Sequence, residues 1–421
     1  MNISEISWGD DSAELDPNLS QYFVSSAAYT RLLTATKSLV IGRKGAGKSA
    51  LRTSLEDHFK KQPNSHIINI SPSYGAVNAI MKNTEIQSQF GTEIFFEHTW
   101  LRQILLDALC TIGNSTKGRY AKNSEQFARD ISIQMNRTTL DFLENITEVL
   151  GKLKFHVGEL GEYGAIIEKN LRDIADADSL EHHVVELAKS GAKMYVFIDD
   201  LDLGWDNSTT SNNFLLGLLK ASLYLKGLSK NIHCFIFLRA DVYSILMSGT
   251  QHSDKYRNVE RIRWSKETLK EMLEKRINHN RQEQGFPPLE KAFDSVFPST
   301  VGTTYTDNWL VERTLSRPRE LLQLARFYTE ALTTTAPNSE TLKEVEEEYS
   351  EWKLQDLCTE YSNQYPGLGT LFQIWVENYT RTKYTLTREE LDERAQKIFS
   401  EARSNHKWFQ NLVKKRTQPL S

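Results

Sequence analysis

The chain has 421 residues, enough for two or three domains, and its 39% hydrophobic and 25% charged residues are typical of a water-soluble globular protein. Its net charge of −4 excludes a global positive field that would draw it onto nucleic acid or an anionic membrane. Three widely spaced cysteines, a polar and acidic N-terminus and the lack of an apolar run of about 20 residues predict a cytoplasmic protein without a membrane span.

Residues 1–36 are predicted to be an N-terminal arm and lead-in. Residues 1–20 are polar and predict a loose arm, whereas residues 21–36 carry aromatic and aliphatic side chains. These aromatic side chains either pack in the core, which is the commoner role, or contact a nucleotide base.

A glycine-rich loop, residues 42–49, follows a predicted strand at 38–41 and precedes a predicted helix at 50–59. It fits the pattern G-x-x-x-x-G-K-[ST], in which glycines let the backbone approach a phosphate and the helix N-terminus attracts the anion. Lys48 is expected on the β- and γ-phosphates of ATP, and Ser49 on Mg²⁺. The predicted nucleotide-binding residues are Gly42, Arg43, Lys44, Gly45, Ala46, Gly47, Lys48, Ser49 and Ala50. We call residues 42–49 the glycine loop.

Strands and helices alternate through the predicted ATPase core, residues 37–265. Further strands are predicted at 66–70, 193–200 and 231–239, and helices at 93–112 and 214–228. Continuous apolar strands of this kind are typical of a parallel sheet with helices on both faces, an α/β fold. Residues 113–190 are polar and mostly helical, and they exceed what a βαβ unit needs, so they predict a helical insertion.

Two aspartates end the apolar run at residue 198. Ligands of open α/β sheets bind at the carboxyl ends of strands, so Asp199 is a predicted Mg²⁺ ligand opposite Ser49. Asp200 is expected to orient the attacking water. Because aspartate is one methylene shorter than the glutamate usual in such ATPases, either hydrolysis is slow or Asp202 assists.

Arg239 ends the strand at 231–239 and is a predicted catalytic cation facing the γ-phosphate. An ion pair with Asp199, Asp200 or Asp241 is an equally good interpretation. Arg257 or Arg261 is a weaker candidate for an arginine finger, since solvated basic residues are common.

Two further arginines flank Pro318 in a predicted helix with Ser316 as its N-cap. Arg317 and Arg319 would oppose the helix dipole there, which favours binding of a triphosphate over a plain surface position. Arg317 is a predicted nucleotide-binding residue and Arg319 a predicted catalytic one.

The chain beyond residue 265 is mostly helical. Residues 266–340 are a predicted helical lid, and residues 341–421 a C-terminal helical domain. Thr387 and Glu390 form a capping box that opens a helix through Leu391 and Ile398.

Together these motifs resemble the AAA+ and STAND group of P-loop ATPases, most closely bacterial ATPases with a GRKGxGKSAL loop and an RPR helix, related to Orc/Cdc6 and KAP-type NTPases. The resemblance covers residues 20–335. It implies that residues 42–49 are Walker A, Asp199 and Asp200 Walker B, Arg239 sensor 1, and Arg317 or Arg319 sensor 2. Residues 341–400 partly match the family's winged helix, without a clear pair of wing strands.

The resemblance implies an oligomeric ATP-driven switch that regulates a separate effector, in bacterial antiphage defence for several members. An Orc-type ATPase is an alternative, with a C-terminal domain that binds duplex DNA using Arg403 and the basic run at 414–416. A non-catalytic nucleotide-binding module is another, and a small-molecule kinase a weak fourth. No guanine-specific [NT]KxD motif is present, so ATP is the expected nucleotide.

Overall fold

A computed structural model describes residues 1–10, 12–72, 78, 82, 92–116, 123–135, 146–149, 152, 176–202, 204–250, 253–332, 336–362, 365–379, 382, 385–402 and 408–410. The chain divides into two compact units, Met1–Leu342 and Lys343–Ser421.

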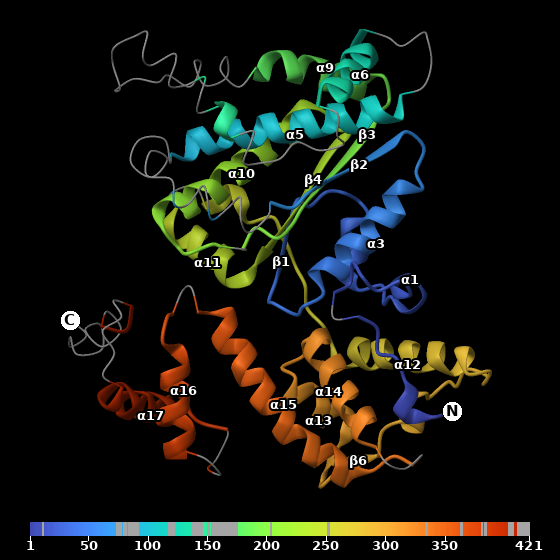
Figure 1. The fold of residues 1–421 in the computed structure, drawn as a ribbon, viewed down its shortest axis with the longest axis vertical. Helices are drawn as coiled ribbons and strands as arrows, with labels where there is room; N and C mark the ends of the chain where they lie inside the picture. The colour runs from blue at the N-terminus through green and yellow to red at the C-terminus, as the bar shows by residue number, and fades with distance from the viewer. Residues whose placement is uncertain are drawn as a thin grey trace. The chain divides into compact units, whose positions relative to one another are not determined.

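Five parallel strands form the sheet of the first unit (Figure 1), in the order β2-β3-β4-β1-β5. They are β1 (Leu39–Gly42), β2 (Ser65–Ile70), β3 (Lys193–Ile198), β4 (Ile232–Arg239) and β5 (Val259–Arg261). The predicted parallel sheet flanked by helices is confirmed. Because the strands are parallel, the glycine loop after β1 and Asp199 after β3 leave the same edge of the sheet, with only β4 between the two strands.

Alternate residues of each strand point to opposite faces, and helices cover both. Figure 1 shows α3 (Lys48–Lys60) on one side of the sheet and α5 (Glu93–Ser115) with α10 (Thr209–Leu228) on the other. Apolar strand residues pack against α5 and α10, among them Ile68, Val196, Ile198, Cys234 and Ile236. The α3 face is aromatic and includes Leu51, Leu55, Phe59, Tyr195, Phe197, Phe235 and Phe237. Leu51, Leu55 and Phe59 therefore form the apolar face of α3, and Cys234 lies in the core.

Short side-chain caps fix where the covering helices begin. The Thr92 side chain accepts a hydrogen bond from the Phe95 amide at the start of α5, and Ser208 does the same for α10. The remaining elements are η1 (Ile3–Glu5), α1 (Leu19–Tyr22), α2 (Ala27–Leu32), α6 (Asn123–Met135), α9 (Ala177–Lys189), α11 (Ala240–Gly249), η3 (Ser253–Tyr256), α12 (Lys266–Glu283), η4 (Phe293–Ser295), β6 (Thr300–Val301), β7 (Thr304–Tyr305), α13 (Thr306–Arg313), α14 (Pro318–Ala331), α15 (Ser339–Glu360), α16 (Leu368–Tyr379) and α17 (Arg388–Glu401).

The predicted insertion at 113–190 is described only in part. Helices α6 and α9 pack on α5 and extend the core on that face of the sheet. Residues 117–122, 136–145, 150–151 and 153–175 lie outside the described residues.

The N-terminal segment, residues 3–10 and 12–24, packs on α12 and α14 instead of forming a loose arm. Ile3, Ile6 and Trp8 are buried, and the Trp8 indole nitrogen donates a hydrogen bond to Thr329 Oγ1 in α14 at 3.0 Å. The prediction of a loose arm at 1–20 was wrong, because Ile3, Ile6 and Trp8 are buried and the segment is hydrogen-bonded to residues more than 260 positions later in the chain.

Two local predictions also need correction. Residues 259–261, which were not predicted as a strand, form the edge strand β5. Glu260 in this strand is buried and makes ion pairs with Arg31 and Lys37. Helix α14 begins at Pro318 with Arg317 as its N-cap. Ser316 is not the cap because its backbone has a φ of 56°, outside the extended conformation that an N-cap residue adopts.

The described part of the second unit is helical. The capping box at Thr387 and Glu390 is present and opens α17 as predicted. Wing strands do not occur among its described residues, and Arg403 and residues 414–416 lie outside them. Across the described parts of both units, no helix combines the length and the hydropathy that a bilayer crossing requires.

Candidate functional site

A cavity of about 760 Å³ opens at the carboxyl ends of β1 and β3. The predicted site residues in its wall are Lys44, Gly45, Gly47, Lys48, Ser49, Ala50, Asp199, Asp200 and Arg319, with Asp202 beside them. Five other predicted residues, all of them described, lie outside this lining: Gly42, Arg43, Ala46, Arg239 and Arg317.

The glycine loop turns sharply from β1 into α3. Gly45 and Gly47 have φ values of 74° and 84°, a left-handed conformation that suits glycine. Gly47 is the N-cap of α3, so no cap side chain competes for the first amides of the helix. A helix N-terminus of this kind attracts an anion.

Two residues that follow β5 in the chain donate hydrogen bonds to the glycine loop. The Arg319 backbone nitrogen donates to the Gly45 carbonyl at 3.2 Å, and the Trp264 indole nitrogen donates to the Ala46 carbonyl at 2.9 Å. Glu320, 2% exposed, lies directly against Gly45. The loop conformation is therefore tied to the start of α14.

Asp199 is buried in the cavity wall, with 3% of its surface exposed. Its Oδ1 accepts a hydrogen bond from the Asp200 amide at 2.9 Å, while Oδ2 has no hydrogen-bond partner among the described residues. Burial raises the pKa of Asp199 to about 6, although the Arg52 guanidinium, 3.8 Å from Oδ2, and the Asp200 amide act against this. Asp200 has a φ of 59°, uncommon for a residue with a side chain.

The described residues contain no group of three or more His, Cys, Asp or Glu side chains that would hold a metal ion by themselves. Mg²⁺ at phosphate sites takes only one or two protein ligands and completes its shell with phosphate oxygens and water. Ser49 and the Oδ2 atom of Asp199, which accepts no hydrogen bond from the described part of the chain, fit that arrangement.

The predicted cations differ in what surrounds them. Arg239 is buried, and its Nη2 and Nε lie 2.6 and 3.1 Å from the two Asp241 oxygens, with Asp202 at 3.5 Å. The ion-pair interpretation of Arg239 therefore describes its position. Arg317 pairs with Glu320 at 3.2 Å.

Lys48 and Arg319 line the cavity and have no ion-pair partner among the described residues. The Lys48 Nζ atom lies 3.5 Å from the Arg43 carbonyl oxygen. Of the weaker candidates, Arg257 is exposed, and Arg261 stacks over the Tyr243 ring at 5.3 Å.

Several charged residues of the cavity were not predicted from the sequence, among them Arg52 and Glu14. Arg52 Nη2 lies 2.9 Å from Glu14 Oε1, and its Nε lies 3.3 Å from Glu56 Oε1. Burial alone would raise the pKa of Glu14, yet hydrogen bonds from Ser12, its own backbone and Ser49 together with the Arg52 charge lower it. The position of Arg52, one helical turn after Lys48, was a usable signal, whereas nothing near Glu14 in the sequence points to the loop.

One wall of the cavity is apolar. It is formed by Phe23, Val24, Ile262, Trp264, Met272 and Leu322. Phe23 and Tyr22 of the lead-in both line the cavity, and Tyr22 is buried against Arg276.

The sequence of the chain is similar to known proteins in two respects. Residues 267–358 match the FunZ-associated C-terminal helical domain, a stretch that contains α13, α14 and most of α12 and α15. The chain is also 25% identical over 393 residues to a transposon gamma-delta 80.3 kDa protein of Escherichia coli strain K12. That match covers 88% of this chain and 54% of the relative, so the chain spans about half the length of the curated relative it matches.

Proposed function

We propose that the chain binds ATP with Mg²⁺ at the glycine loop and hydrolyses it as a switch. The observation that carries this proposal is the buried Oδ2 of Asp199, which accepts no hydrogen bond from the described residues and lies in the same cavity as Lys48 and Ser49. A buried carboxylate oxygen without a hydrogen-bond donor is costly, and a metal ion bound beside it would remove that cost.

Each residue has a role that follows from its place. Lys48 and the first amides of α3 would bind the phosphates, and Ser49 with Asp199 would hold Mg²⁺, which neutralises charge that develops on the transferred phosphoryl group. Asp200, at the cavity wall, would orient the attacking water, and Arg319 would add positive charge from α14.

The base would lie against the apolar wall that contains Phe23 and Trp264. Adenine fits because the sequence lacks the motif that reads guanine. The switch would work through α14, whose first turn is bonded to the glycine loop. An ordered or released helix that responds to the γ-phosphate is a common switching device.

A homo-oligomer that regulates a separate effector protein, as in antiphage defence, is part of this proposal and is supported by the resemblance of the motifs. The Orc-type alternative depends on Arg403 and the basic run at 414–416, which lie outside the described residues.

Binding of a fluorescent ATP analogue with Mg²⁺ tests the proposal. Lys48→Ala should abolish binding, whereas Lys60→Ala, which removes the same charge from the exposed end of α3, should not. Asp199→Asn should remove the Mg²⁺ dependence of binding. Equal binding by wild type and Lys48→Ala would overturn the proposal.

Two further measurements separate the alternatives. Steady phosphate release that disappears in Asp200→Ala identifies an ATPase, while binding without release identifies a non-catalytic module. Sedimentation with and without ATP tests the oligomeric switch, and identical profiles would contradict it.

A further inference from the structure

Glu14 brings a carboxylate into the candidate site from a distant part of the chain. It accepts hydrogen bonds from Ser12 Oγ at 2.7 Å and Arg52 Nη2 at 2.9 Å, and it lines the same cavity as Ser49. Ser49 is the proposed metal ligand, and Arg52 also lies 3.8 Å from Asp199. One internal anion is therefore connected through Arg52 to Asp199, one of the two residues proposed to hold the metal.

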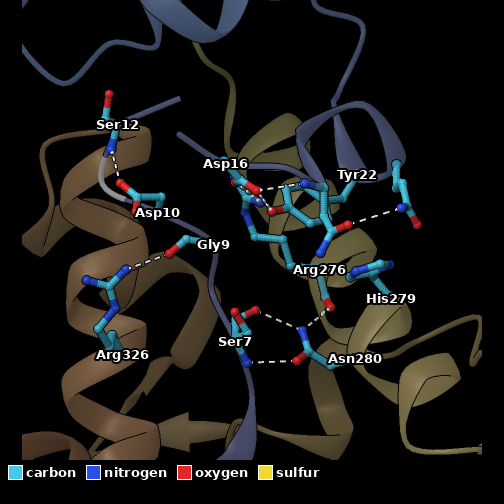
Figure 2. Close-up of polar contacts among 12 residues, drawn as sticks. Ser7, Gly9, Asp10, Ser12, Asp16, Tyr22, Arg276, His279, Asn280 and Arg326 are labelled. Carbon is cyan, nitrogen blue, oxygen red and sulfur yellow. Dashed lines mark hydrogen bonds and ion pairs between the residues drawn. The ribbon is translucent and has the colours of Figure 1, made fainter. Parts of the chain in front are cut away.

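The residues on both sides of Glu14 are anchored to α12 and α14 (Figure 2). Ser7 exchanges two hydrogen bonds with the Asn280 side chain, at 2.7 and 2.8 Å, and the Gly9 carbonyl accepts from Arg326 at 2.9 Å. Asp16 lies 3.8 Å from Arg276 and is hydrogen-bonded by Tyr22.

Few contacts hold the stretch around Glu14 itself. Leu15 is 70% exposed, and the Glu14 side chain is 36% exposed. Movement of residues 12–15 would therefore break little packing, whereas movement at Ser7 or Asp16 would break buried hydrogen bonds.

Charge makes the present Glu14 position and a bound triphosphate mutually unfavourable. Two negative charges in one cavity repel each other, and water at the exposed part of the Glu14 side chain weakens this repulsion. A cation beside Asp199 would in addition repel Arg52, the partner that holds Glu14 in place.

We propose that Glu14 is an internal inhibitory anion that occupies the site when nucleotide is absent, and that binding of metal and triphosphate displaces it. Since the stretch around Glu14 is anchored at Ser7, Gly9 and Asp16, its displacement is transmitted to α12 and α14. This inference rests on the proposed function and adds a second connection between the site and these helices.

The test is the affinity for a fluorescent ATP analogue with Mg²⁺ in wild type, Glu14→Gln and Glu5→Gln. Glu14→Gln keeps the shape of the side chain and removes its charge, while Glu5→Gln makes the same change at an exposed position of the same segment. Glu14→Gln should bind about three- to tenfold more tightly, because the protein no longer has to expel the anion. Glu5→Gln should match wild type.

Hydrogen exchange of a peptide spanning residues 12–16 provides the second measurement. In wild type its exchange should quicken when ATP and Mg²⁺ are added, and in Glu14→Gln it should be fast under both conditions. Unchanged or weaker ATP binding by Glu14→Gln, while wild type binds, would overturn this inference alone. Absence of ATP binding in wild type would overturn the proposed function and the inference with it.

Discussion

Gly45 of the glycine loop and Glu320 of α14 lie so close that no side chain fits between them. A Cβ atom on Gly45 would stand 2.5 Å from Glu320 Oε2 and 3.1 Å from Oε1. Gly45 also has a φ of 74°, which disfavours any other residue. Glycine is thus required here for the backbone conformation and for the approach of α14.

Gly45→Ala should therefore be strongly destabilising, and Gly285→Ala is its matched control. Gly285 has a φ of 80° with nothing within 4 Å of the added Cβ. Both substitutions should cost about 1–2 kcal/mol from the left-handed backbone. Gly45→Ala should cost a further 1–3 kcal/mol or so, because Glu320 must move. Urea unfolding measures both, and equal costs would show that Glu320 yields freely.

Arg319→Ala should weaken ATP binding by roughly 10- to 100-fold, because hydrogen bonds to charged groups contribute about 1.5–3 kcal/mol. Arg317→Ala is the comparison, since its side chain pairs with Glu320 instead of lining the cavity. That variant should mainly lower the free energy of unfolding. If Arg317→Ala weakens binding more than Arg319→Ala, the assignment of these two arginines is reversed.

Trp8→Ala should lower the free energy of unfolding by about 3–5 kcal/mol, the usual cost of truncating a large buried aromatic side chain. Trp8 is 2% exposed, packs near Phe297 and donates to Thr329. Trp8→Phe should cost less, because it retains most of the apolar surface. A change below about 0.5 kcal/mol in Trp8→Ala, as for an ordinary surface site, would mean that the N-terminal segment is loose after all.

Cys234 should resist thiol reagents at pH 8 in the folded protein. Burial raises the pKa of its thiol to about 12 from an ordinary 9.0, so only about one molecule in ten thousand carries the reactive thiolate at pH 8. Cys358 is partly exposed and should be labelled first. Mass spectrometry of the labelled peptides decides the order, and early labelling of Cys234 would contradict its burial.

The same pKa predicts a loss of stability at high pH. The raised pKa in the folded state means that ionisation favours unfolding once the pH passes 9. The difference in unfolding free energy between wild type and Cys234→Ala should therefore shrink from pH 8 to pH 10, whereas a constant difference would exclude this effect.

The sequence was a good guide wherever the pattern was local. Strands β3 and β4 are continuous apolar runs, and the glycine loop places Gly47, Lys48 and Ser49 by adjacent spacing alone. The prediction that Asp199 belongs to the site follows from its position directly after β3. These features depend on residues that are neighbours in the chain, so hydrophobic periodicity and motif spacing are enough to predict them.

Features built from distant partners could not be predicted. The edge strand β5 contains a charged Glu260 that is buried only because Arg31 and Lys37 neutralise it. The segment around Trp8 has few apolar side chains, so its sequence predicts a polar arm. The hydrogen-bond partner of Trp8, Thr329, lies far away in α14. Arg239 illustrates a third limit, since the sequence allowed both a phosphate contact and an ion pair, and only the side-chain conformation distinguishes them.

The hydrogen bond between Trp8 and Thr329 joins residues 321 positions apart. Ribosomes add about 5–20 residues per second, so Trp8 leaves the ribosome roughly 15 to 65 s before its partner is made. During that interval the side chains of Ile3, Ile6 and Trp8 lack their native contacts and are open to chaperones and proteases. The order of synthesis therefore makes closure of the N-terminal segment over α14 one of the last steps in the maturation of the first unit.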